Sequence, residues 1–182
     1  MPNRGLLLTM TETPPEIEAE FNDWYDTEHL PERLAIPGFI SALRWQADLP
    51  PGQGRYLATY ELESAAVLES PAYLARFRDS PTAWTERMLG SCTVFRRWAC
   101  EQLPPGNAAP DPAARALLLA CGELPTQRMP PPVKALSARH FLASSGSPRY
   151  VGLYESPREE LDPPRDHAEW RLQIYRAYSR KA

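Results

Sequence analysis

Residues Arg55–Glu61 read RYLATYE, and the segment returns later in the chain as RYVGLYE at Arg149–Glu155. Three further segments have a second copy in the same order: 5–10 (GLLLTM) returns at 116–121 (ALLLAC), 43–45 (LRW) at 138–140 (ARH), and 94–98 (VFRRW) at 174–178 (IYRAY). Matched segments in a matched order are typical of a duplicated structural unit. The sequence therefore predicts two related halves.

Bulk composition limits the classes of protein that this chain can be. At 182 residues, 43% of them hydrophobic, it can bury a substantial core. A net charge of -3 argues against a nucleic-acid partner, which normally requires a concentrated basic surface. No apolar run approaches the roughly 20 residues that cross a bilayer, and the N-terminus does not resemble a signal peptide. We expect a cytoplasmic protein with no membrane partner and with three reduced cysteines.

Hydrophobic periodicity and the positions of proline and glycine divide the first half into six elements. Thr13 with Pro14, Pro15 and Glu16 is typical of a helix N-terminus. The predicted elements are a strand at 6–10, a helix at 15–30, paired strands at 39–47 and 55–62, helix at 64–89 broken at Ser80–Pro81, and a strand at 92–101. This order is that of the ferredoxin-like fold, an antiparallel sheet with two helices on one face.

The second half keeps the strands and loses helix. The segment after residues 116–121 is too short for the first helix, and the second helix is reduced to about Arg165–Arg171. We predict a first half at 1–103, a Pro-rich linker at 104–114, and a degenerate half at 115–182. The predicted fold class is α+β, with the two ferredoxin-like halves packed sheet to sheet as one α/β barrel.

Residues 21–31 (FNDWYDTEHLP), followed by 36–39 (IPGF) and 42–45 (ALRW), resemble the dimeric α/β-barrel superfamily, and more narrowly its EthD-like members. That family usually builds its barrel from two chains. The resemblance implies that this tandem fusion is an intrachain pseudo-dimer, with homodimer formation left open. It also implies one surviving site, in the first half. Relatives include small cofactor-free isomerases, cyclases, decarboxylases and monooxygenases, some haem proteins, and members without an assigned activity.

His29 is the leading catalytic candidate. Tyr25 and Asp26 precede it by four and three residues, so helical spacing predicts that the three side chains share one flank. An imidazole with an ordinary pKa near 6.5 exchanges protons at neutral pH, and a carboxylate on its far nitrogen would fix its tautomer. The alternative is a histidine that only complements the dipole at a helix C-terminus.

Glu28 is a second catalytic candidate. It projects toward the apolar face of the helix that carries Phe21 and Trp24, where a carboxylate must be paired or protonated. A structural salt bridge to Arg33 or Arg44 is the favoured alternative.

Aromatic and basic side chains are the candidates for binding a substrate, although most residues of these types serve as core or ion-pair residues. The predicted lining consists of Trp24, Trp45, Tyr60, Trp98, Arg44 and His140. A buried guanidinium of Arg44, Arg96 or Arg97 could hold a carboxylate. In the repeat alignment His140 takes the place of Trp45, so both are predicted to face one interior.

Neither a phosphate-binding glycine motif nor GxSxG is present, and the three histidines lack metal-ligand spacing, so no metal or cofactor is expected. His167 lies in a polar stretch and is expected to be solvated. The predicted function is acid/base catalysis on a small aromatic or cyclic carbonyl compound: isomerisation, cyclisation, dehydration or decarboxylation. One alternative is a non-catalytic small-molecule-binding or scaffold protein. Another is a haem or cofactor-free monooxygenase. A sealed, fully packed interior at His29 would argue against catalysis.

Overall fold

The computed structural model describes residues 3–79, 81–129, 132, 134–165 and 168–179. Its strands are β1 (Gly5–Glu12), β2 (Phe39–Gln46), β3 (Tyr56–Leu62), β4 (Val94–Gln102), β5 (Ala116–Gly122), β6 (Ser137–Ser145), β7 (Tyr150–Ser156) and β8 (Trp170–Ala177). Its α-helices are α1 (Glu18–Trp24), α2 (Leu30–Leu34), α3 (Pro71–Leu74) and α4 (Ala83–Gly90). Shorter turns are the 3-10 segments η1 (Pro15–Ile17), η3 (Ala65–Glu69) and η5 (Thr126–Arg128) and the π-helical segments η2 (Tyr25–His29) and η4 (Ala75–Asp79).

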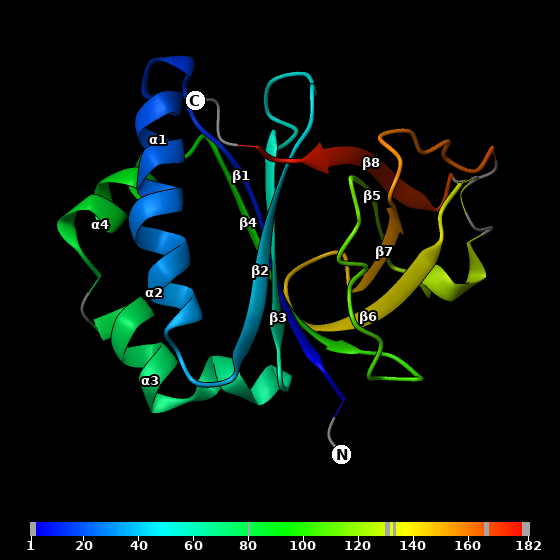
Figure 1. Ribbon diagram of the computed structural model, residues 1–182, viewed down its shortest axis with the longest axis horizontal. Coiled ribbons are helices and arrows are strands. Elements are labelled where there is room, and N and C mark those ends of the chain that lie inside the picture. The colour runs from blue at the N-terminus through cyan, green and yellow to red at the C-terminus, as the bar shows by residue number, and fades with distance from the viewer. Residues whose placement is uncertain (1–2, 80, 130–131, 133, 166–167, 180–182) are drawn as a thin grey trace.

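The strands of the described residues form one closed antiparallel barrel in the order β1-β3-β2-β8-β5-β7-β6-β4. The group β4-β1-β3-β2 joins the group β8-β5-β7-β6 where β2 pairs with β8 and β4 pairs with β6. The α-helices lie against the first group of strands (Figure 1). The α+β class, the closed barrel and the predicted β2–β3 hairpin are confirmed. No helix among the described residues is long and apolar enough to cross a membrane.

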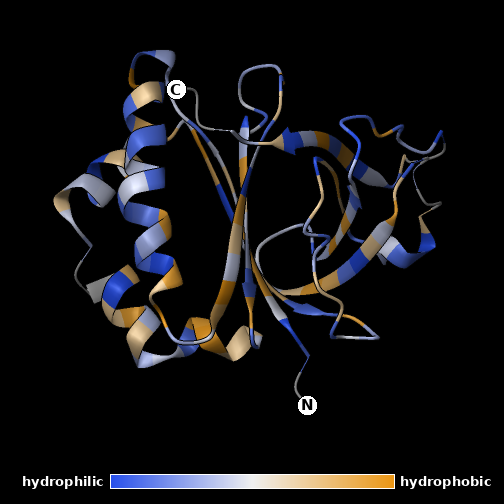
Figure 2. Cartoon of the chain, in the orientation of Figure 1, coloured by the Kyte–Doolittle hydropathy of each residue, from blue (hydrophilic) through white to orange (hydrophobic). Residues whose placement is uncertain are grey.

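Alternation along the strands separates two cores, because successive side chains point to opposite faces of a sheet. On β1, Leu6, Leu8 and Met10 point into the barrel, whereas Leu7 packs under the helices. Hydrophobic and hydrophilic bands follow one another along β6 and β8 (Figure 2). The first group of strands therefore serves two cores at once, one on each face.

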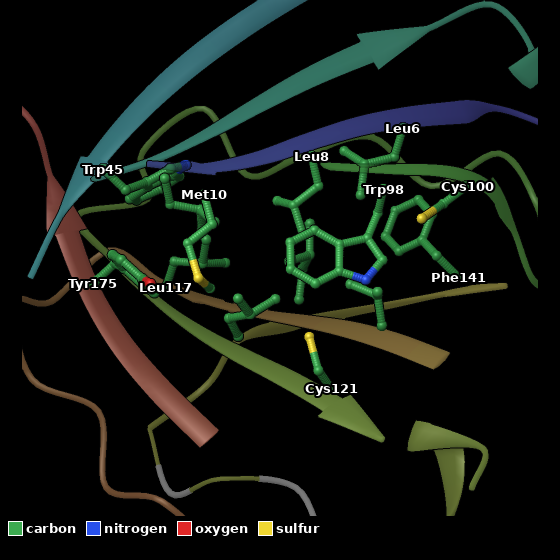
Figure 3. Packing of buried hydrophobic residues seen from close by; sticks show 14 of the residues in the cluster. Leu6, Leu8, Met10, Trp45, Trp98, Cys100, Leu117, Cys121, Phe141 and Tyr175 are labelled. Carbon is green, nitrogen blue, oxygen red and sulfur yellow. The ribbon is translucent and has the colours of Figure 1, made fainter. Parts of the chain in front are cut away.

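The barrel interior is filled with side chains. Trp45 and Trp98 are 1% and 2% exposed, and they meet aliphatic residues from both groups of strands (Figure 3). Trp45 donates its indole N–H to the Thr59 hydroxyl at 3.2 Å, and Trp98 donates to the Pro148 carbonyl at 3.1 Å. The interior is thus a packed core, as in other small barrels.

The first helix extends further than predicted. Residues 15–34 form one continuous helical run, with η2 between α1 and α2. The run passes through Pro31 because the backbone widens just before it, where the Leu30 N–H bonds to the Tyr25 carbonyl five residues back. A proline has no N–H and clashes with the carbonyl four residues before it, so a locally wider turn accommodates Pro31.

The predicted helix at 64–89 is divided into η3, α3, η4 and α4. Ser70 begins α3 by accepting a hydrogen bond from the Tyr73 N–H, and Thr82 begins α4 by accepting one from the Thr85 N–H. The break predicted at Ser80–Pro81 falls partly outside the described residues, because Ser80 is not among them.

Two predictions for the second half are wrong. Arg165–Arg171 was predicted as helix, but β8 already begins at Trp170, and within 165–171 only Asp166 and His167 lie outside the described residues. His140 does not occupy the place of Trp45. Trp45 lies opposite Leu57, and in the second half Phe141 lies opposite the matching residue, Val151. The repeat alignment is one residue out of register there, which sends His140 to the opposite face of the sheet.

A buried ion cluster joins the two groups of strands across one end of the barrel. Arg139 on β6 donates to Glu61 on β3 at 2.8 Å and to Glu155 on β7 at 2.6 Å, and all three side chains are at most 4% exposed. Burial raises the pKa of Glu61 in spite of the neighbouring guanidinium, so desolvation outweighs the attraction at this carboxylate. Glu61 and Glu155 are the matching last residues of the repeat, and Arg139 holds both.

We expect Arg139→Met to lower the free energy of unfolding by about 3–5 kcal/mol, because it leaves two buried carboxylates without their cation. Arg76→Met is the matched control, since its exposed ion pair with Glu32 contributes at most about 1 kcal/mol. Urea unfolding at pH 7 measures both. Equal losses in the two variants would contradict the role assigned to the cluster.

Candidate active site

His29 lies at the end of the π-helical segment η2, beneath the helix layer and against the outer face of the first group of strands. Its imidazole packs against the rings of Trp24 and Tyr25, with centroids 4.5 and 4.9 Å away. Only 7% of the residue is exposed, and its Nδ1 is buried without a hydrogen-bond partner among the described residues. A polar atom in this situation is uncommon in a folded protein, and a functional role is one physical reason for it.

The surroundings of His29 keep its imidazole neutral. Burial lowers its pKa well below the ordinary value, and the positive charges of Arg33 and Arg44 lower it further. A neutral imidazole has one nitrogen that can accept a proton. The site thus holds a proton acceptor at neutral pH.

Two phenols lie next to His29. The hydroxyls of Tyr25 and Tyr60 are 2.7 Å apart, and the Tyr25 hydroxyl is also 3.3 Å from that of Thr9 on β1. Burial raises the pKa of both tyrosines, so both keep their protons near neutral pH and can donate hydrogen bonds. The structure brings together His29, Tyr25 and Tyr60 as a base beside two donors.

Asp26 does not meet His29 as predicted. Its carboxylate accepts a 2.6 Å hydrogen bond from Arg44, which also donates to the Asn22 side chain at 2.5 Å. The Arg44 guanidinium lies 4.4 Å from the centre of the Tyr25 ring and 4.0 Å from that of Tyr178. Asp26 therefore fixes Arg44, and Arg44 in turn supports the phenol of Tyr25.

Glu28 is turned away from the imidazole. It accepts hydrogen bonds from Thr82 at 2.5 Å and from Thr85 at 3.2 Å, at the start of α4. The predicted salt bridge to Arg33 or Arg44 is wrong. Glu28 instead anchors α4, and Trp24 adds to this contact by donating to the Thr85 hydroxyl at 3.1 Å.

The six residues predicted to bind a substrate are divided among three places. Tyr60, Trp24 and Arg44 lie around the His29 site. Trp45 and Trp98 fill the barrel interior, away from the helix layer. His140 lies on the outer face of the second group of strands, where its Nδ1 is 2.9 Å from the Thr126 hydroxyl and its ring contacts Tyr154.

Beside His29 lies a small cavity, of about 20 Å³, with room for roughly one water molecule. Its lining is Leu7, Thr9, Thr11, Tyr25, His29, Arg33, Tyr60, Tyr73, Phe77, Leu89, Phe95 and Arg97. Phe95 is 45% exposed, so the cavity lies just beneath the surface at that residue. The space at His29 is small but is not packed solid.

Arg33, Tyr73 and Phe77 were not predicted from the sequence as site residues. The spacing of Arg33 was a usable signal, because a residue four positions after His29 lies on the same helix flank. Tyr73 and Phe77 come from α3 and η4, and only the packing of those segments against β4 brings them to the site. No local pattern could have located them.

A separate, open cleft of about 1120 Å³ runs between α1 and the segment that precedes β8. Its lining is rich in carboxylates from residues such as Glu18, Asp48 and Glu160. Asp26 and Tyr178 also line it, and both contact Arg44. Arg44 therefore lies between this cleft and the phenol of Tyr25.

No protein-family model matches the chain. A curated relative, core atranone cluster (CAC) protein 1 from Stachybotrys chlorohalonatus (strain IBT 40285), is 35% identical over 83 residues. The match covers 44% of this chain, which spans only 36% of the length of that relative.

Among solved structures, an anthrone oxidase-like protein superposes with a TM-score of 0.58 at 10% identity, covering 98% of this chain and 92% of that one. A protein provisionally assigned as a chlorite dismutase gives 0.54 at 10% identity, covering 98% and 96%. One from Fusobacterium nucleatum subsp. nucleatum ATCC 25586, provisionally assigned as a monooxygenase, gives 0.50 at 6% identity, covering 97% and 92%. These proteins share the ferredoxin-like fold of the dimeric α/β-barrel type.

We expect the stability of the wild type to fall on acidification below about pH 6.5 more steeply than that of His29→Asn. The pKa of His29 is lowered in the folded state, so in that range the unfolded chain binds the proton first. Per pH unit, the free energy of unfolding of the wild type should fall by at most about 1.4 kcal/mol more than that of His29→Asn. Urea unfolding between pH 8 and pH 5 measures it, and parallel profiles for the two proteins would show that His29 is not held neutral.

Proposed function

We propose that the protein is a small cofactor-independent enzyme that moves a proton next to the carbonyl of a small aromatic or cyclic compound. The observation that carries this proposal is the neutral, buried imidazole of His29 beside the paired hydroxyls of Tyr25 and Tyr60. A base and a hydrogen-bond donor that converge on one space are the two groups that enolisation requires. Isomerisation, cyclisation and dehydration include such a step, and decarboxylation, which forms the enolate by loss of CO₂, ends with the reverse step, the return of a proton to carbon.

In this mechanism His29 accepts a proton from the carbon next to the carbonyl. The hydroxyl of Tyr25 or Tyr60 donates a hydrogen bond to the carbonyl oxygen, where negative charge develops. Arg33 and Arg44 disfavour the imidazolium but favour the enolate that forms together with it. The two guanidinium groups therefore act in opposite directions on the two products of the proton transfer, the imidazolium and the enolate.

A substrate must displace part of the cavity wall to reach His29. The cavity of about 20 Å³ is far smaller than a ring compound. Phe77, Leu89 and Phe95 form the wall on the outer side, and Phe95 is already partly exposed. We propose entry at these three side chains.

The cavity beside His29 does not fit a haem. At about 20 Å³ it lacks room for a macrocycle. No step of the mechanism passes through such a group.

A cofactor-free monooxygenase is the second candidate. It is favoured by the similarity of this fold to those of the anthrone oxidase-like protein and the protein provisionally assigned as a monooxygenase. The same proton abstraction by His29 would start that reaction, since an enolate or phenolate is electron-rich enough to react with O₂. Oxygen uptake during turnover distinguishes the two candidates.

A role in small-molecule biosynthesis is supported by the similarity to the core atranone cluster protein.

We further propose that the chain is an EthD-like tandem fusion whose two halves act as an intrachain pseudo-dimer. The repeated segments fall on matching strands, β1 with β5, β3 with β7 and β4 with β8. The barrel orders β4-β1-β3-β2 and β8-β5-β7-β6 also match.

The test is turnover of aromatic keto acids, lactones and phenolic carbonyl compounds by wild type, His29→Asn and the control His140→Asn. We expect His29→Asn to lose about 10²–10⁴-fold in rate, because it lacks the general base, and His140→Asn to keep the wild-type rate. Thermal stabilisation reports binding independently of turnover, reaching about 2.7 kcal/mol at 100 Kd. Undiminished turnover by His29→Asn would refute the mechanism, and binding without turnover by the wild type would favour a carrier protein.

A further inference from the structure

We propose that Arg33 and Arg97 form an anion site that holds the carboxylate of an aromatic or cyclic acid in the cavity beside His29. This inference rests on the proposed function, since it assigns a charged group to the substrate of the same site. The anion site would hold the substrate at a second point, in addition to the hydrogen bond at the reacting carbonyl.

Arg33 is a buried cation without a carboxylate partner among the described residues. The residue is 3% exposed, and its Nη1 has no hydrogen-bond partner there. Its guanidinium carbon lies 5.6 Å from the centre of the Tyr73 ring and 5.3 Å from that of Phe77. Elsewhere in the described part of the chain, arginines at five positions pair with carboxylates: Arg44, Arg55, Arg76, Arg87 and Arg139. Arg33 instead faces aromatic rings.

Arg97 approaches the same aromatic pair from β4. Its Nη2 donates to the Tyr73 hydroxyl at 3.2 Å, and its guanidinium carbon lies 5.7 Å from the centre of the Phe77 ring. Its Nε is buried without a partner among the residues that the structure describes. Two guanidinium groups from different elements thus line one cavity, each with an unused buried N–H.

Leaving a buried cation unpaired is costly, and an anionic ligand would remove that cost. The planar donor fork of arginine matches a carboxylate better than a point charge does. Aromatic rings form much of the remaining wall, including those of Tyr25, Tyr60 and Phe77. A carboxylate attached to an unsaturated ring fits this combination of charge and apolar surface.

The position of Arg33 also suits the chemistry at His29. The two residues are four positions apart in one helical run, and both line the cavity. A carboxylate on Arg33 would place the adjoining part of the ring next to the imidazole and to the phenols. The arginine pair would then determine which carbon of the substrate faces the base.

The experiment is calorimetric titration of the intact protein with benzoate, and with benzamide as its uncharged analogue. We expect benzoate to bind the wild type at least tenfold more tightly than benzamide does. Arg33→Met and Arg97→Gln should each weaken benzoate binding at least tenfold. Arg76→Met removes an exposed, paired arginine and should leave the affinity unchanged.

Removal of the unpaired charge in Arg33→Met should also leave the thermal midpoint at or above that of the wild type. If that variant does not fold, Arg97→Gln decides the question alone. Benzoate affinity that equals that of benzamide, or that is unchanged in the folded arginine variants, would overturn the proposal.

His29→Asn separates this proposal from the proposed function. Its benzoate binding should still depend on Arg33 and Arg97, because both arginines are intact. Arginine-dependent benzoate binding in a protein without turnover would keep the anion site and refute only the catalytic role. Turnover of neutral carbonyl compounds without benzoate binding would keep the catalytic role and refute only the anion site.

Discussion

The indoles of Trp45 and Trp98 belong to one hydrophobic core that fills the interior of the barrel. Apart from the Arg139 cluster at one end, the inner face is committed to this core, so further reactive side chains of the strands lie on the outer face. In the second group of strands the outer face carries a small apolar cluster that includes Tyr154 and Trp170. On the first group, the helix layer encloses polar groups between itself and the sheet. The filled interior thus directs chemistry to the space under α1 and α2.

Within that space the helical run departs locally from regular α-helical geometry. Pro31 interrupts the regular hydrogen bonding, and the wider turn η2 before it presents His29 beside Trp24 and Tyr25. The site carries further costs, since His29 and Arg33 both have buried nitrogen atoms without partners among the described residues. Costs of this kind are usually retained where a ligand or a reaction uses the groups. The Arg139 cluster differs from Arg33 in that its charges form ion pairs across the barrel, although Arg139 Nε and Glu61 Oε2 also lack a hydrogen-bond partner among the described residues.

The sequence allowed accurate prediction where local spacing determines the outcome. Alternation placed β2 and β3 correctly, and helical spacing brought Tyr25 to His29. Long-range contacts were not predictable: the partner of Asp26 is Arg44 on β2, and that of Glu28 is α4. His140 was misplaced because a one-residue error in a weak repeat reverses the face of a strand. Arg33 was predicted only as a salt-bridge partner, because its lack of a carboxylate is visible only in three dimensions.

The most direct test of the proposed site is a crystal structure of the protein with an aromatic keto acid bound. We predict that the ring lies between the helix layer and the sheet, with its carbonyl near Tyr25 and its carboxylate on Arg33. The side chain of Phe77 or Phe95 should have moved to admit it. A ligand in the open cleft beside Asp48 and Glu160, or inside the barrel at Trp98, with the cavity at His29 unchanged, would contradict this placement.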